Sequence, residues 1–99
     1  MFIYNVTVSI DKSLAEEWLN WMKTVHVPDV LKTGYFTENK ICKILNVDDE
    51  GETFSVQYTF NIMADIEAYQ QNDAKRLQEE HSKRYEGKYA AFRTLLEIM

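Results

Sequence analysis

Apolar and polar residues alternate along the first ten positions of the chain. The positions of one face are apolar: Phe2, Tyr4, Val6, Val8 and Ile10. The positions of the other face carry neutral hydrogen-bonding groups: Asn5, Thr7 and Ser9. Such alternation is typical of a strand with one buried face. We therefore predict a strand over residues 2–10, whose polar face is left to water, a ligand or another subunit.

A second strand with two different faces is predicted over residues 52–60. Its apolar positions, Phe54, Val56, Tyr58 and Phe60, alternate with Ser55, Gln57 and Thr59. The preceding run, residues 40–47, is also rich in apolar residues. Between the two runs, the acidic tetrapeptide Asp48–Gly51 ends in glycine, which is typical of a tight connection between antiparallel strands. We expect a hairpin whose second arm lies beside the first strand.

Helical spacing predicts two helical regions. Ser13 and Glu16 have the spacing of a capping box, and an apolar stripe then indicates a helix over residues 13–25. Pro28 suits the first turn of a second short helix, residues 27–32, which Gly34 ends. The other helical region covers residues 63–86, with a weak point at Asn72–Asp73 where the helix bends or restarts. The residues expected to point inward from it are Ile66, Tyr69, Leu77, His81 and Tyr85.

A last strand is predicted over residues 89–98, with Phe92, Leu96 and Ile98 toward the core and Arg93 on the polar face. The element order is then β-α-β-β-α-β. Right-handed crossovers turn this order into a four-stranded antiparallel sheet with both helices on one face. The predicted fold class is α+β, ferredoxin-like, in a single domain that spans residues 1–99. The core expected under the helices contains Phe2, Tyr4, Val6, Val8, Val56, Tyr58, Phe60 and Phe92.

Composition narrows the class of protein. With 45% hydrophobic residues the chain is too apolar for disorder, and no uncharged stretch is long enough to cross a bilayer. The N-terminal run lacks a basic leader and reads as a strand, so it is not expected to be a signal peptide. Cys42 is the single cysteine, which excludes an internal disulfide and fits a reducing compartment. We expect a cytoplasmic protein without a membrane partner.

The charge pattern argues against nucleic acid as a partner. The formal net charge is −5, and the basic residues of the second helical region are interleaved with glutamates. An RNA-binding sheet of this fold would need exposed aromatic residues on its central strands. The chain carries neutral polar residues at those positions.

Four segments, YNVTVSID, EWLNWMKTVHVPDVLKTGYFT, SVQYTF and AFRTLLEIM, resemble in order and spacing an uncharacterised bacterial ferredoxin-like family, catalogued as a domain of unknown function. More distantly, the chain is similar to the dimeric α/β-barrel superfamily, which includes antibiotic-biosynthesis monooxygenase-like proteins, haem-degrading monooxygenases, muconolactone isomerases and stress-responsive barrel proteins. The resemblance implies a homodimer in which two sheets face each other, with a ligand cleft in each subunit. The nearer family brings no known reaction.

The polar sheet face is the predicted ligand-binding surface. Its residues are Asn5, Thr7, Gln57 and Thr59, joined by Arg93 from the last strand. A neutral polar lining with one arginine suits a carbonyl, phenol or carboxylate ligand. The same groups can instead form hydrogen bonds across a dimer interface or face solvent, and the sequence leaves these alternatives open.

Two histidines are candidates for chemistry. His26 is expected where the chain turns over the sheet edge, and there it can act as a general acid or base oriented by Asp29, or cap the preceding helix. Besides His26, Arg93 is a weak candidate for a catalytic residue. In haem-degrading relatives a helix histidine ligates iron beside an asparagine and a tryptophan, and His81 and Asn5 match two of these positions. Phe60 stands at the tryptophan position, so we expect no cofactor, with haem at His81 as the alternative.

The spacing of histidines and cysteine predicts no metal site, since two histidines lie 55 residues apart in the sequence. Gly-rich phosphate loops and hydrolase nucleophile motifs are absent from the sequence. The leading hypothesis is a small cytoplasmic homodimer that binds a small organic ligand, with or without catalysis. The alternative is a non-catalytic structural or regulatory interaction module whose polar sheet face serves dimerisation.

Overall fold

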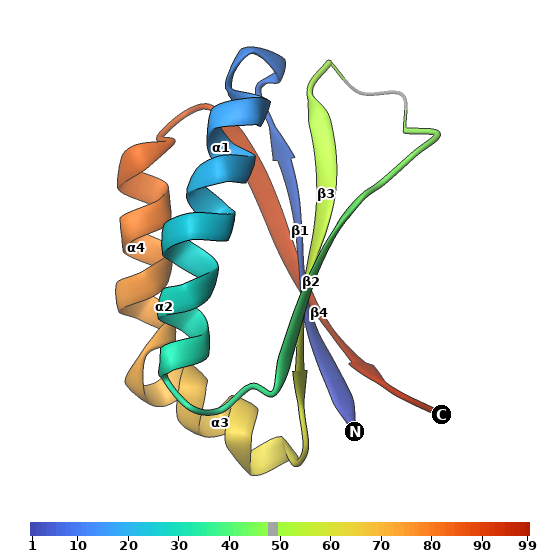
Figure 1. Ribbon diagram of the computed structural model, residues 1–99, viewed down its shortest axis with the longest axis vertical. Coiled ribbons are helices and arrows are strands. Elements are labelled where there is room, and N and C mark those ends of the chain that lie inside the picture. The colour runs from blue at the N-terminus through green and yellow to red at the C-terminus, as the bar shows by residue number, and fades with distance from the viewer. Residues whose placement is uncertain (48–49) are drawn as a thin grey trace.

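The computed structural model describes residues 1–47 and 50–99. Four antiparallel strands form one sheet in the order β2-β3-β1-β4. The strands are β1 (Phe2–Ile10), β2 (Glu38–Lys43), β3 (Glu52–Phe60) and β4 (Tyr89–Glu97). The helices α1 (Ala15–Trp21), α2 (Val27–Lys32), α3 (Met63–Asn72) and α4 (Ala74–Arg84) lie on one side of the sheet and leave the other side open (Figure 1). This arrangement confirms the predicted α+β, ferredoxin-like fold.

The central strand β1 fixes the two faces of the sheet, because it pairs with both β3 and β4. Asn5 stands opposite Gln57 on β3 and opposite Thr94 on β4, so these three residues share the open face. Val6 stands opposite Val56 and Arg93 on the helix-covered face. The predicted alternation of β1 and β3 is thereby confirmed. The predicted hairpin connection Asp48–Gly51 lies partly outside the described residues, and β2 ends at Lys43, earlier than residue 47.

The first helical region is one continuous helix. A π-helical turn, η2 (Met22–His26), joins α1 to α2 with no loop between them (Figure 1). Pro28 lacks an amide N–H and its ring crowds the carbonyl four residues back, so a regular α-helix cannot pass through it undisturbed. The wider turn accommodates Pro28, and the Val27 amide bonds to the Met22 carbonyl, five residues back. His26 therefore lies inside a helix, and its predicted place at a chain turn is wrong.

The start of this helix also differs from the prediction. A short 3₁₀ turn, η1 (Lys12–Leu14), precedes α1, and its N-cap is Asp11. The Asp11 carboxylate accepts hydrogen bonds from the Ser13 backbone N–H at 2.9 Å and from Ser13 Oγ at 2.7 Å. Asp11 is thus the N-cap, and Ser13 donates to it instead of serving as the cap itself.

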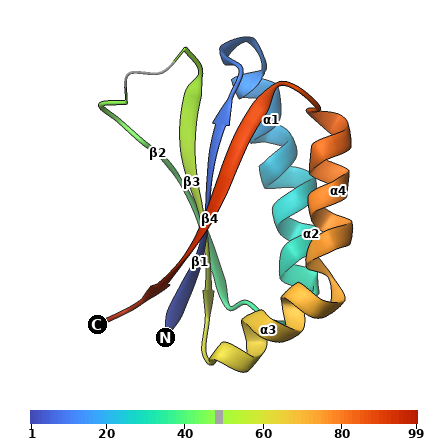
Figure 2. The same ribbon diagram turned by 180° about the vertical axis from the view of Figure 1, so that it is seen from behind.

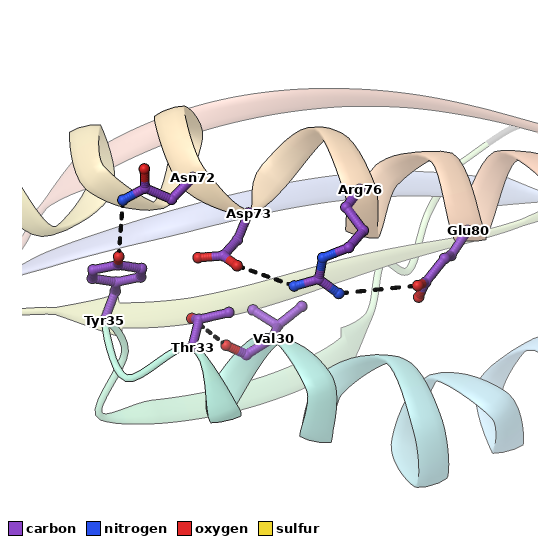
Figure 3. Close-up of polar contacts among 7 residues, drawn as sticks. All are labelled: Val30, Thr33, Tyr35, Asn72, Asp73, Arg76 and Glu80. Carbon is purple, nitrogen blue, oxygen red and sulfur yellow. Dashed lines mark hydrogen bonds and ion pairs between the residues drawn. The ribbon is translucent and has the colours of Figure 1, made fainter.

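The predicted weak point in the second helical region is confirmed. α3 ends at Asn72 and α4 begins at Ala74, and the bend redirects α4 alongside the α1–α2 helix (Figures 1 and 2). Arg76 bonds to Asp73 at 3.0 Å and reaches Glu80 at 4.0 Å (Figure 3). Asn72 Nδ2 donates to the Tyr35 hydroxyl at 3.2 Å, which links the bend to the segment after α2. These contacts stabilise the start of α4 and connect the bend to the segment after α2.

The last strand faces the opposite way from the prediction. Phe92 is 61% exposed on the open face, opposite Thr7, and Leu96 lies there as well, opposite Ile3. Arg93 points toward the helices. Both faces of β4 carry apolar residues, so the alternation of apolar and polar positions does not show which face is covered by the helices. Tyr89 lies on the covered face, where its ring packs edge-on against His81 with centroids 4.5 Å apart.

Within the described residues, no helix combines the length and the apolar character that crossing a membrane requires.

Candidate functional site

A cavity lies between the helix-covered face of the sheet and the helices. Its volume is about 40 Å³. Most of its wall is apolar, formed by Val6, Val8, Met22, Val30, Val56 and Ala91. The polar groups in the wall come from β1, η2, β3, both later helices and β4: Tyr4, His26, Tyr58, Tyr69, Gln78, His81, Tyr89 and Arg93. An apolar pocket with a few converging polar groups is the usual form of a small-molecule site.

His81 is held in this cavity as a neutral hydrogen-bond donor. Its side chain is buried, and the indole N–H of Trp18 donates to its Nε2 at 2.9 Å. A nitrogen that accepts a hydrogen bond carries no proton, so the imidazole proton of neutral His81 is on Nδ1. Burial lowers the pKa of His81 to about 4, with smaller contributions from His26 and Arg93. At neutral pH His81 therefore offers an N–H group and no charge.

His26 reaches the same cavity from the π-helical turn. Its ring packs against Trp21, with centroids 5.2 Å apart, and lies 5.8 Å from the ring of His81. Burial lowers the pKa of His26 to about 4; the charge of Asp29 opposes this shift and Arg93 adds to it. His26 Nδ1 is buried and has no hydrogen-bond partner among the described residues. Such an atom costs free energy unless a ligand or water meets it.

Three buried tyrosines, Tyr4, Tyr58 and Tyr69, line the cavity. Within the described part of the chain their hydroxyl groups have no hydrogen-bond partner. Burial raises the pKa of Tyr58 and of Tyr69 well above the usual value, so both hydroxyls stay protonated and can donate. The sequence pattern predicts these residues in the core and does not predict that their hydroxyls line a cavity. The choice of tyrosine at inward positions was the one available indication, because phenylalanine would fill the same space without a hydroxyl that needs a hydrogen-bond partner.

Arg93 supplies the only formal charge among the residues that line the cavity. It makes no ion pair with a carboxylate of the described residues. Its charge helps to lower the pKa of both cavity histidines. The structure thus brings together two of the predicted site residues, His26 and Arg93, on the helix-covered side of the sheet.

The other predicted ligand-binding residues lie on the opposite side. Asn5, Thr7, Gln57 and Thr59 face the open side of the sheet, so the predicted grouping of Arg93 with them is wrong. Asn5 Nδ2 donates to Thr7 Oγ1 and to Thr94 Oγ1, each at 3.1 Å. These polar groups largely satisfy one another.

Ser55 connects two strands of the same network. Its hydroxyl donates to Asn5 Oδ1 at 2.6 Å and accepts from Gln57 Nε2 at 3.1 Å. We call this set, Asn5, Thr7, Ser55, Gln57 and Thr94, the open-face network. Its internal bonds leave fewer free groups for a ligand than the cavity does.

The residues do not fit the haem site that the resemblance implies. Asn5 faces the open side, whereas His81 faces the cavity, so one haem cannot contact both. His81 Nε2 is also engaged by the Trp18 indole. In the ranges 1–47 and 50–99, no three histidine, cysteine or carboxylate side chains lie close enough to hold a metal ion together.

Solved structures show the same fold at low sequence identity. A dimeric ferredoxin-like protein from an uncultured marine organism has a TM-score of 0.73 and 13% identity, with coverage of 100% of this chain and 95% of that chain. A putative antibiotic biosynthesis monooxygenase from Nitrosomonas europaea has a TM-score of 0.69 and 10% identity over 100% and 99%. An ethyl tert-butyl ether D (EthD) family protein from Bacillus halodurans has a TM-score of 0.67 and 12% identity over 100% of both chains.

No curated protein matches the chain in sequence. The family described as "Domain of unknown function (DUF4286)" matches residues 1–99. The chain therefore belongs to this family.

Proposed function

We propose that this chain is a small cytoplasmic homodimer that binds a small organic ligand in the cavity between the sheet and the helices, without a cofactor. The observation that carries the proposal is the set of polar atoms around this cavity that lack partners within the described chain. His26 Nδ1 is buried and unpaired, and the hydroxyls of Tyr58 and Tyr69 are unpaired as well. A ligand that met His26 Nδ1 would recover the free energy lost by burying this atom without a partner, and the two hydroxyls can bond to the same ligand.

The polar side chains that line the cavity are also suited to acid–base catalysis. Two neutral imidazoles lie with their ring centroids 5.8 Å apart, next to an arginine, in a largely apolar cavity. Such groups can accept or donate a proton and can stabilise a developing negative charge on a substrate oxygen. The proposal concerns binding first, and turnover is a second measurement on the same ligand.

A screen by thermal shift tests ligand binding. A ligand at about ten times its Kd stabilises the folded state by about 1.4 kcal/mol, which corresponds to about 5–10 °C for a chain of this size. Ala91→Leu narrows the cavity and is expected to abolish that shift. Ala64→Leu, an exposed position in the first turn of α3, is the matched control and should keep it. Absence of any stabilising compound in a broad aromatic and organic-acid library would contradict the proposal.

The open face supports the homodimer part of the proposal. Phe92 and Leu96 are exposed there beside a neutral network, and large exposed apolar groups on a sheet face favour an interface over solvent. Two structural neighbours are described as dimeric ferredoxin-like proteins. Sedimentation or light scattering should give twice the chain mass of 11.7 kDa. A monomer at micromolar concentration would contradict this part alone and would leave the cavity proposal standing.

One observation supports the alternative, a structural or regulatory interaction module without a ligand. The open-face network satisfies most of its own hydrogen bonds, as an interface without a ligand requires. The two hypotheses concern opposite faces of the sheet, so variants can test them separately. A chain that dimerises but binds nothing in the cavity would favour the module.

A further inference from the structure

We infer that the ligand of the cavity is a small organic anion with a flat apolar body, whose charged end pairs with Arg93. This inference rests on the proposed function and specifies its ligand class. Three features of the cavity support it: its charge, the direction of its hydrogen bonds and the shape of its wall.

The charge of the cavity is opposite to that of the chain. The protein has 16 acidic residues and a formal net charge of −5, yet no aspartate or glutamate lines the cavity. Arg93 lies in its wall, without an ion pair to any described carboxylate. Arg93 is also exposed to solvent, and a cation at the edge of a cleft with apolar walls attracts anions toward that cleft. The ligand that best completes this site carries a negative charge.

Several side chains around the cavity can donate hydrogen bonds to a ligand. Tyr58 and Tyr69 hold their hydroxyl protons, and the Trp18 bond leaves His81 with its proton on Nδ1. Arg93 has only donors. A carboxylate is the natural complement, because its two oxygens accept several hydrogen bonds and a neutral amide accepts fewer.

The apolar part of the wall fits a flat ligand body. Val6, Val8 and Ala91 come from the sheet, whereas Met22 and Val30 come from the helix opposite. Because the lining residues come from two packed layers, we expect the space between them to be narrower across the layers than along them. An aromatic or conjugated acid fills such a space better than a branched one.

Matched pairs of acids and amides test the inference: benzoate with benzamide, cinnamate with cinnamamide, and salicylate with salicylamide. The members of each pair have nearly the same shape and differ in charge. In titrations followed by protein NMR, at least one acid should bind about tenfold more tightly than its amide, since a charge-assisted hydrogen bond contributes at this level. Equal binding of acid and amide in every pair, or no binding by any acid, would overturn the inference.

Variants then assign the charge recognition to Arg93. Arg93→Ala should reduce acid binding about tenfold and leave amide binding within about threefold, whereas Arg93→Lys should retain part of the acid preference. Lys75→Ala removes a positive charge from an exposed position of α4 and is the control for net charge. An unchanged acid affinity in Arg93→Ala would also overturn the inference. Equal melting temperatures of the unliganded variants would show that they fold alike.

Signals of the histidine side chains locate the bound acid. The ring nitrogen resonances of His26 and His81 should shift with benzoate in the wild type and stay unshifted in Ala91→Leu. A neutral ligand that binds the cavity while all three acids fail would contradict the anion inference and preserve the proposed function. If no compound binds, neutral or charged, both the anion inference and the proposed function are contradicted.

Discussion

The polar side chains on the two faces of the sheet differ in whether they have hydrogen-bond partners. On the open face, Asn5, Ser55 and Thr94 bond to one another across three strands. On the covered face, Tyr58 and His26 bring polar atoms into a cavity where the described chain offers them no partner. A face that satisfies itself needs only to be covered, whereas a face with unpaired polar atoms is suited to binding. The difference is the reason why we propose an interface on the open face and a ligand site on the covered face of the same sheet.

The largest expected effect is an acid sensitivity that belongs to the covered face. His26 and His81 have pKa values lowered to about 4, chiefly by burial. Between the ordinary histidine pKa of about 6.5 and 4, the unfolded chain binds more protons than the folded chain, so stability falls as pH falls. We expect the free energy of unfolding to drop by roughly 3 kcal/mol for each of the two histidines between pH 7 and pH 4, measured by urea denaturation.

The double variant His26→Gln, His81→Gln tests this assignment. Glutamine does not titrate, and its side-chain oxygen can accept the Trp18 indole N–H in place of His81 Nε2. The stability of the double variant should change much less than that of the wild type between pH 7 and pH 4. The open-face network contains no ionisable group, so dimerisation should vary little over that range. An unchanged pH profile in the double variant would move the acid sensitivity to another part of the molecule.

The second effect concerns the open face. Phe92→Asp places a charge on the exposed apolar part of that face, and we expect the proposed dimer to weaken by about 2–3 kcal/mol, or roughly 30- to 150-fold in Kd. Leu95→Asp is the matched control, since Leu95 is 47% exposed on the other face of the same strand. Analytical ultracentrifugation distinguishes the two. Equal weakening by both variants would mean that the open face is not the specific interface.

The third effect tests how His81 is positioned. Trp18→Phe removes the indole donor, frees His81 Nε2 and should raise the pKa of His81 toward its ordinary value. We expect a loss of about 1–3 kcal/mol in stability, because an interior hydrogen bond and part of a large side chain are lost. Trp21→Phe, whose ring also touches both histidines, is the control and should leave the pKa of His81 nearly unchanged. Histidine titration by NMR gives both values.

The same comparison explains what the sequence could predict. Strict alternation in β1 and β3 determined which face is covered, since a shift of one residue would expose every large apolar side chain. In β4, Tyr89 and Leu95 lie on one face and Phe92 and Leu96 on the other, so the pattern is ambiguous. The pairing of Val6 on β1 with Arg93 on β4 resolves the ambiguity, and the pattern of β4 alone does not contain that pairing.

The site was harder to predict for local reasons. Pro28 usually begins a helix, and the sequence gives no direct sign that a π-helical turn carries the helix through it and turns His26 inward. Tyrosine and phenylalanine have the same hydrophobic pattern, so Tyr58 and Tyr69 appear as core residues. Whether a buried hydroxyl finds a partner depends on the neighbouring elements, and a single strand or helix does not encode it.

The smallest expected effect compares one substitution on each face of β3. Ser55→Ala removes the hydroxyl that joins Asn5 to Gln57 and should lower stability by about 1 kcal/mol, because both partners lose a hydrogen bond. Tyr58→Phe removes a hydroxyl without a partner in the described chain and should leave the unliganded stability equal or raise it by about 0.5 kcal/mol. The same variant should weaken binding of the acid probes several-fold, because one donor is lost. Chemical denaturation of both variants, with and without benzoate, measures all of these changes. A clear loss of unliganded stability in Tyr58→Phe would mean that this hydroxyl serves the fold, as Ser55 does on the other face.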